Sequence, residues 1–131
     1  MITKINYDGY FVNNFSLEKI QDTNGGRYVT KYIEQRVEVY ERKENYQPFA
    51  YKIEIELKAF NGAEEDANLA YILNVNFDVK FVNNNEDVEL PDDFFIENEW
   101  FFQKYTFLAT KSVIENLLDK TSLEGLRLPY A

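Results

Sequence analysis

The sequence predicts an α+β domain in which a four-stranded antiparallel sheet is followed by one long helix and a short C-terminal helical turn. Two observations support this prediction. Four segments in the first two-thirds of the chain alternate apolar and polar residues, which is the period of a half-buried strand. Residues 98–119 then form a long segment with helical periodicity. Strands that precede a helix, without alternating with helices, are typical of an antiparallel sheet covered on one face.

The four strands are expected at residues 5–15, 27–42, 49–60 and 69–82. In each strand the main apolar set falls on odd numbers and the charged residues fall mostly on even numbers. Ile33 and Val39 are therefore expected to face the core from the second strand. Gly9 lies inside the first strand and predicts a bulge or a close backbone approach. Because no linker, repeat or low-complexity tract is apparent, residues 1–131 are expected to form a single domain.

Two loops between the strands allow a functional interpretation, but a solvated turn is favoured for both. Residues 22–26 contain two glycines whose N–H groups could cradle a phosphate, yet the P-loop spacing and a following helix are missing. Residues 61–68 contain three consecutive acids, whose spacing does not match the alternating ligands of an EF-hand. We therefore expect no metal site and no cofactor.

The composition argues against several classes of partner. With 14 basic and 23 acidic residues, the chain has a net charge of −9 and lacks the cationic surface that nucleic acid or an anionic membrane requires. It has no cysteine, which removes disulfides and thiolate zinc sites. Residues 1–8 contain no apolar signal-peptide core, and no run of about 18 apolar residues occurs. A cytoplasmic protein is the resulting expectation.

The chain also has no histidine, which removes the commonest general base and the commonest metal ligand. Catalysis would have to rest on carboxylates, lysine, tyrosine or serine. We therefore do not expect an enzyme.

The helix at residues 98–119 is apolar nearly all round, with Asn98 as the expected N-cap. Such a helix is buried on more than one side. One sheet can cover only one flank, so we expect self-association into a closed homo-oligomer, either a dimer or a tetramer. The candidate interface residues are Phe101, Tyr105, Phe107, Leu108, Ile114 and Leu118.

Three large apolar residues precede this helix. Phe94, Phe95 and Ile96 follow the polar connection of residues 83–93 and are expected on a loop or short turn. They are a liability in water unless a groove or a partner covers them.

With these features the chain resembles the SecB family of bacterial protein-export chaperones, and most of all its short relatives from Gram-positive bacteria. Residues 5–18 (INYDGYFVNNFSLE) resemble the opening strand of the family. Residues 101–118 resemble its long helix, and residues 123–129 (LEGLRLP) resemble its terminal segment. The likeness follows the order of elements along nearly the whole chain.

The resemblance implies a homotetramer built as a dimer of dimers, with helices sandwiched between two eight-stranded sheets. It also implies a holdase that keeps unfolded polypeptides in aromatic-lined grooves beside the connection into the long helix. Phe94, Phe95, Ile96 and Trp100 lie at that connection and are the candidate peptide-binding residues. The alternative, given equal weight, is that they are core or subunit contacts.

Two departures from the family count against a partnership with the SecA motor. The polar sheet face carries both signs of charge, and we expect no tail beyond the terminal segment, since the sequence stops at Ala131. The chaperone hypothesis is affected less by these departures than the SecA partnership is, and the sequence does not specify the polypeptide clients.

Two other functions remain open. The same scaffold could bind a small apolar molecule in a cavity between helix and sheet, or could be a structural oligomer. A carboxylate-based hydrolase acting on sugars is ranked last. Its candidate acids are Asp92, Asp93, Glu97 and Glu99.

Overall fold

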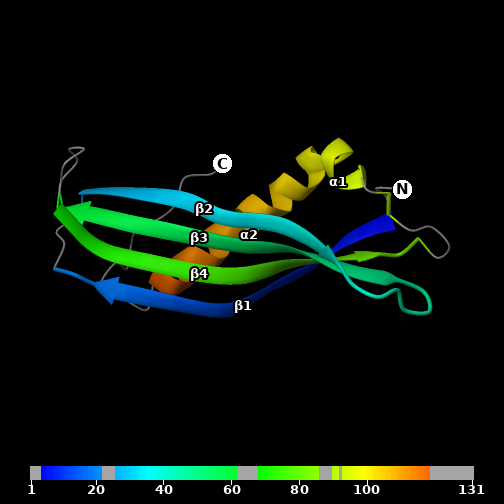
Figure 1. Ribbon diagram of the computed structural model, residues 1–131, viewed down its shortest axis with the longest axis horizontal. Coiled ribbons are helices and arrows are strands. Elements are labelled where there is room, and N and C mark those ends of the chain that lie inside the picture. The colour runs from blue at the N-terminus through cyan, green and yellow to red at the C-terminus, as the bar shows by residue number, and fades with distance from the viewer. Residues whose placement is uncertain (1–3, 22–25, 62–67, 86–89, 92, 119–131) are drawn as a thin grey trace. The chain divides into compact units, whose positions relative to one another are not determined.

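The computed structural model describes residues 4–21, 26–61, 68–85, 90–91 and 93–118. Its elements are β1 (Ile5–Lys19), β2 (Gly26–Val39), β3 (Gln47–Asn61), β4 (Asn68–Asn83), α1 (Phe94–Glu97) and α2 (Glu99–Leu118). The strands form one sheet in the order β1-β4-β3-β2, so three consecutive strands lie side by side and β1 pairs with the last of them (Figure 1). This confirms the predicted antiparallel sheet and long helix. The turn expected at residues 121–124, and most of both interstrand loops, lie outside the described residues.

The chain has two compact units, and every strand contributes to both. The helix-bearing unit contains the described residues of 4–10, 38–51 and 79–118. The strand unit contains the described residues of 11–37 and 52–78. The organisation of the chain as one domain stays a prediction.

The core of the strand unit comes from the two central strands. Ile55 and Leu57 of β3, and Val75 and Phe77 of β4, are fully buried, and all four are odd-numbered as expected. The prediction is wrong for much of β1 and β2, where Phe11 is 60% exposed and Ile33 is 46% exposed. The reason is that β1 and β2 lie at the edges of the sheet and each has a neighbouring strand on one side only.

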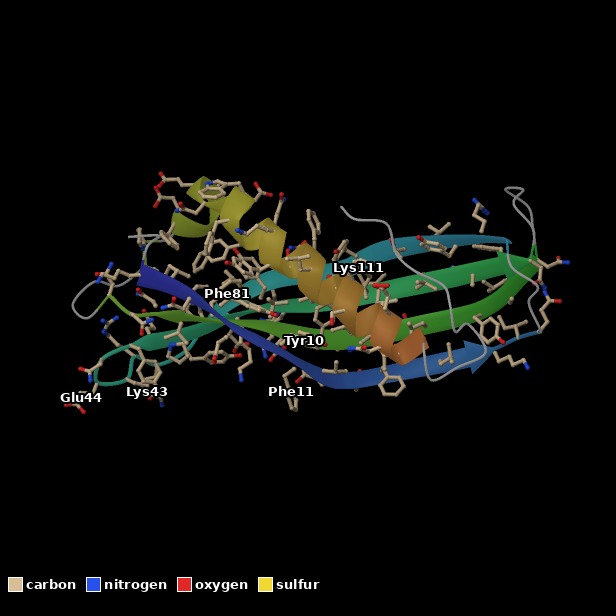
Figure 2. The ribbon with its side chains drawn as sticks, turned by 180° about the vertical axis from the view of Figure 1, so that it is seen from behind. Tyr10, Phe11, Lys43, Glu44, Phe81 and Lys111 are labelled. Atoms are coloured by element: carbon tan, nitrogen blue, oxygen red, sulfur yellow. The ribbon has the colours of Figure 1, made fainter. Side chains whose placement is uncertain are left out.

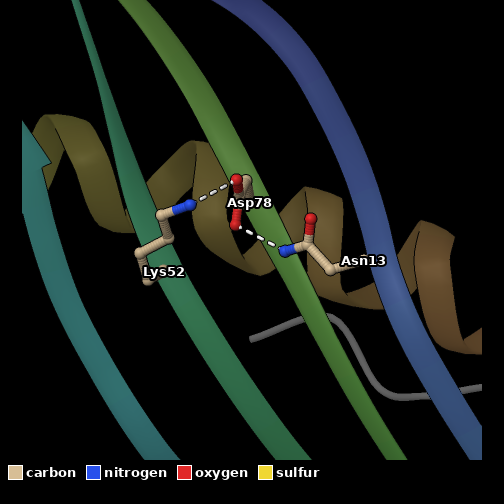
Figure 3. A network of polar contacts seen from close by, with 3 residues as sticks. All are labelled: Asn13, Lys52 and Asp78. Atoms are coloured by element: carbon tan, nitrogen blue, oxygen red, sulfur yellow. Dashed lines mark hydrogen bonds and ion pairs between the residues drawn. The ribbon is translucent and has the colours of Figure 1, made fainter. Parts of the chain in front are cut away.

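A polar network ties three strands of the strand unit together, on the side that carries the even-numbered residues of β3 and β4. Lys52 Nζ of β3 lies 2.7 Å from Asp78 Oδ2 of β4. Asn13 Nδ2 of β1 donates to Asp78 Oδ1 at 2.8 Å. Figure 3 shows the carboxylate between its two partners. Because one carboxylate accepts from both neighbouring strands, the network fixes their alignment at this point.

Gly9 is irregular, as the sequence predicts, and its φ of +88° is one that residues with a Cβ rarely adopt. Its effect is seen in the two tyrosines around it. Tyr7 stacks on Tyr105 of α2 with ring centroids 4.9 Å apart, and the Tyr10 hydroxyl lies 3.0 Å from Ser112 Oγ of α2. In a regular strand, residues three apart point to opposite faces. The irregular residue therefore turns both tyrosines toward the same helix.

The two helices differ in how well the sequence anticipates them. The bounds of α2 lie within one residue of the expected helix at each end. The segment expected as a loop or short turn forms α1, a single helical turn. None of the described helices is long and apolar enough to cross a membrane.

Candidate functional site

The helix-bearing unit contains a continuous group of stacked and edge-on rings, here called the aromatic cluster. Its members come from β1, β3, β4, α1 and α2. They are Tyr7, Phe49, Tyr51, Phe81, Phe94, Phe95, Phe101, Phe102 and Tyr105.

Phe81 and Phe102 form the centre of the aromatic cluster. Their ring centroids lie 5.1 Å apart in an edge-to-face arrangement, and both side chains are 1% exposed. Phe81 comes from β4 and lies near the N-terminal half of α2 (Figure 2). Phe49 of β3 stacks on Phe81 at 5.4 Å. Edge-to-face and offset-stacked pairs at these separations add stabilisation beyond that of buried area, so the start of α2 is firmly attached to these strands.

The short helix α1 inserts two adjacent rings into this group. Phe94 is only 4% exposed and lies 5.9 Å from Phe102, centroid to centroid. Phe95 is half-buried and lies 5.4 Å from Phe49, 5.7 Å from Phe102 and 6.1 Å from Tyr51. Together the two rings cover the end of the aromatic cluster that faces α1.

Two apolar side chains beside them point into solvent. Ile96 is 78% exposed and Trp100 is 65% exposed, the two highest values among the large hydrophobic residues of the described chain. They are four residues apart across the junction of α1 and α2, and the Trp100 ring is edge-on to Phe101 at 5.9 Å. We call Ile96 and Trp100 the exposed pair. An exposed tryptophan on a rigid aromatic base is a ready contact for an apolar ligand.

Asn98 forms the junction between the helices. Its backbone adopts a non-helical φ of −114° and ψ of 25°. Its side-chain Nδ2 donates to the Phe94 oxygen at 2.9 Å and so closes α1. Its own carbonyl oxygen accepts from the N–H groups of Phe101 and Phe102 and so begins α2. This is the N-cap position that the sequence predicts.

Charged groups border the apolar surface. Asp93, Glu97 and Glu99 are exposed, and Glu99 Oε1 accepts a hydrogen bond from Gln103 Nε2 at 2.8 Å. Lys104 Nζ lies 5.0 Å from the centre of the Tyr105 ring, within the range of a cation–π contact. The apolar surface is thus framed by solvated charges.

Burial raises the pKa of Tyr51 well above its ordinary value, and the nearby negative charge of Glu99 raises it further. The phenol of Tyr51 is therefore held neutral within the aromatic cluster. A neutral, half-buried phenol adds an apolar ring to the site and no charge.

The structure brings only part of the predicted peptide-binding set together. Phe94 and Phe95 lie inside the aromatic cluster, whereas Ile96 and Trp100 point outward. The role of the four residues in peptide binding stays a prediction. Sequence reasoning did not identify the rings beneath Phe94 and Phe95, which include those of Phe49, Phe81 and Phe102. The signal available was an aromatic residue near the start of the third strand and another near the end of the fourth.

The candidate interface residues have different environments. Phe101 and Tyr105 contact rings of their own chain, and Ile114 is fully buried within it. Phe107 is half-buried and Leu108 is exposed, so these two retain surface for a partner. The side chain of Leu118 lies outside what the structure describes. The interface itself stays a prediction.

The alternative chemistries find little support in the described residues. Among them, no group of three or more carboxylate, histidine or cysteine side chains could hold a metal. Asp93, Glu97 and Glu99 are solvent-exposed, so none of the three lies in a buried pocket. Asp92 lies outside the described residues. Rings in contact occupy the space beneath the start of α2.

The arrangement of elements is found in a solved structure. The chain is similar to the SecB-like chaperone Rv1957 of Mycobacterium tuberculosis, which was solved in complex with a ChAD peptide from the Rv1956 HigA1 antitoxin. The TM-score is 0.72, over 99% of this chain and 92% of that chain. The chain has a SecB-like fold. This confirms the family fold that the sequence resemblance predicted.

The likeness in fold is not accompanied by a close likeness in sequence. Identity between the two chains is 11%, a level at which similarity extends to the fold alone. No family model matches the sequence, and no curated protein matches it. What the SecB-like fold does in this chain must therefore be argued from its own residues.

Proposed function

We propose that this protein is a SecB-like holdase that binds unfolded or nascent polypeptides without catalysis. The observation that carries the proposal is the exposed pair, Ile96 and Trp100, at 78% and 65% exposure beside a rigid aromatic cluster. Burying such side chains against an apolar client releases water from both surfaces. A fold shared with a chaperone that was solved in complex with a peptide supports the same conclusion.

The proposal includes neither nucleotide nor metal, because affinity comes from apolar contact. The net charge of −9 would keep complexes with aggregation-prone clients in solution. We place the protein in the cytoplasm, where nascent chains are found, and the proposal includes no SecA partner. The clients are polypeptide segments with apolar side chains exposed.

We also propose that the protein self-associates as a dimer or tetramer. Phe107 and Leu108 retain apolar surface on α2, and a second copy would cover it. The edge strand β2 carries exposed apolar residues as well, including Val29 and Ile33. Single exposed apolar residues are ordinary, but a helix face and a strand edge together favour assembly.

The test of the proposed function is suppression of aggregation. A chemically denatured client is diluted into buffer with the protein at equal molar concentration, and light scattering is followed. The native chain is expected to suppress scattering, and Ile96→Ser combined with Trp100→Ser is expected to abolish most of the effect. Phe11→Ser is the matched control, because Phe11 is 60% exposed and lies outside the aromatic cluster. Absence of suppression by the native chain would refute the proposal.

A further inference from the structure

Two rings of α1 occupy a site in their own chain that the aromatic side chains of a client could also occupy. Phe94 and Phe95 are adjacent aromatic side chains laid against an apolar floor of Phe49, Tyr51 and Phe102. An aromatic segment of an unfolded polypeptide presents the same groups. The contact of Phe94 and Phe95 with this floor is therefore a model for how a client could bind.

The floor beneath these rings is complete without α1. Phe49 comes from β3 and Phe102 from α2, and their rings are edge-on at 5.8 Å. Both are 1% exposed when α1 is in place. Phe81 supports both from below, at 5.4 Å and 5.1 Å. Lifting α1 would thus uncover a preformed aromatic surface, since the rings that form the floor are positioned by one another.

The helix α1 has little stability of its own. It contains four residues, and helices this short are unstable in water without tertiary contacts. Its N-cap residue, Asp93, makes no side-chain capping hydrogen bond. The non-helical backbone of Asn98 separates it from α2. The ring contacts of Phe94 and Phe95, together with the hydrogen bond from Asn98 Nδ2 to the Phe94 oxygen, are therefore what hold α1 in place.

We propose that α1 is a flap that turns about Asn98 and, when closed, covers an inner binding site. In the closed state Phe94 and Phe95 lie on the floor formed by Phe49, Tyr51 and Phe102. Two adjacent aromatic residues of a client compete with them for this floor. The inference rests on the proposed function and adds an inner site to the exposed pair. The client first meets the exposed pair and then displaces α1. A closed flap keeps the inner site from binding other copies of the chain or from promoting aggregation.

The first test uses a synthetic extended peptide that contains two adjacent phenylalanines and no tryptophan. Because Trp100 is the only tryptophan of the chain, its emission reports binding without a label. Phe95→Ala removes the flap's main contact with the floor. It should tighten binding of the peptide about tenfold, because a larger fraction of the protein then has the flap open and the floor available to the peptide. The control variant Phe11→Ala should bind as the native chain does. A peptide with both phenylalanines replaced by serine should bind neither protein.

Equal or weaker binding of the peptide by Phe95→Ala would overturn the inference. If that variant does not fold, hydrogen exchange in the native chain decides. The Asn98 N–H donates to the Phe94 oxygen and the Glu97 N–H donates to the Asp93 oxygen, so both amides report the closed flap. Saturation with the peptide should speed their exchange.

Unchanged or slower exchange of these two amides with the peptide bound would also overturn the flap. In that case the client binds on the exposed pair with α1 closed, and the proposed function stands. If neither the peptide nor a denatured client binds to any variant, the proposed function fails as well. The two claims can therefore fail separately.

Discussion

At the scale of single residues, the aromatic cluster decides which side chains matter for stability and which are free to bind. Phe81 and Phe11 are the same residue type on neighbouring strands, yet one is 1% exposed and the other 60%. Figure 2 shows Phe11 pointing away from the sheet. Burial and ring contacts therefore distinguish the aromatic residues that stabilise the fold from those that contribute little to its stability.

Substitution of Phe81 should be among the most destabilising changes in the chain. Phe81→Ala removes a ring that contacts Phe49, Phe102 and Tyr105, and should lower the free energy of unfolding by about 3–5 kcal/mol. Phe11→Ala should lower it by less than about 1 kcal/mol, as for other surface positions. Urea unfolding followed by circular dichroism measures both. Similar losses in the two variants would contradict the assignment of Phe81 to the core.

The raised pKa of Tyr51 predicts a loss of stability at high pH. Its ordinary pKa is 10.0, and burial followed by the charge of Glu99 raises the folded value. Stability is therefore full below pH 10.0 and falls above it, because the phenol ionises in the unfolded chain before it does in the folded one. Between about pH 8 and about pH 11 the native chain should lose more unfolding free energy than Tyr51→Phe. An equal loss in both proteins, measured in urea, would disprove this role of Tyr51.

At the scale of elements, the strands and α2 were predictable from periodicity, and the exceptions have physical causes. Apolar alternation located the buried odd-numbered residues of β3 and β4, because central strands have neighbours on both sides. The same alternation misplaced Ile33, since an edge strand can carry an apolar side without a cover. A helical turn at Phe94–Glu97 could not be predicted from four residues, because tertiary ring contacts stabilise it.

The strand β1 depends on the backbone of Gly9. At a φ of +88° a side chain is strained even though an added Cβ meets nothing within 4 Å. Gly9→Ala should therefore cost about 1–2 kcal/mol of unfolding free energy. Gly9→Asn should cost less, because asparagine tolerates positive φ better than alanine does. Thermal unfolding of the two variants provides the measurement, and an asparagine variant less stable than the alanine variant would point to a steric cause instead.

At the scale of the whole molecule, the SecB-like fold was predictable from the order of four strands and a long helix. The likeness of the first strand and of the helix to those of the SecB family supported the same prediction. The candidate site was predicted in outline only. Its position at the entrance to α2 followed from the run of apolar residues beginning at Phe94. The partition into a buried ring such as Phe94 and an exposed one such as Trp100 depends on packing that no local pattern encodes.

Self-association is the corresponding prediction for the assembled protein. At micromolar concentration, sedimentation velocity should give a mass of two or four chains, because Phe107 and Leu108 retain apolar surface on α2. Leu108→Glu should shift the equilibrium toward smaller species, whereas Lys43→Glu, in the exposed connection between β2 and β3, should not. A monomer at these concentrations would refute the prediction.

The most direct test of the central claim is the binding of a permanently unfolded polypeptide to the native chain. A reduced and carboxymethylated protein that cannot refold is titrated in a calorimeter with the native chain and with the double variant Ile96→Ser, Trp100→Ser. The account predicts saturable binding to the native chain, with a negative heat-capacity change from apolar burial, and at least about tenfold weaker binding to the double variant. Binding that is absent from the native chain, or undiminished in the double variant, would contradict the account.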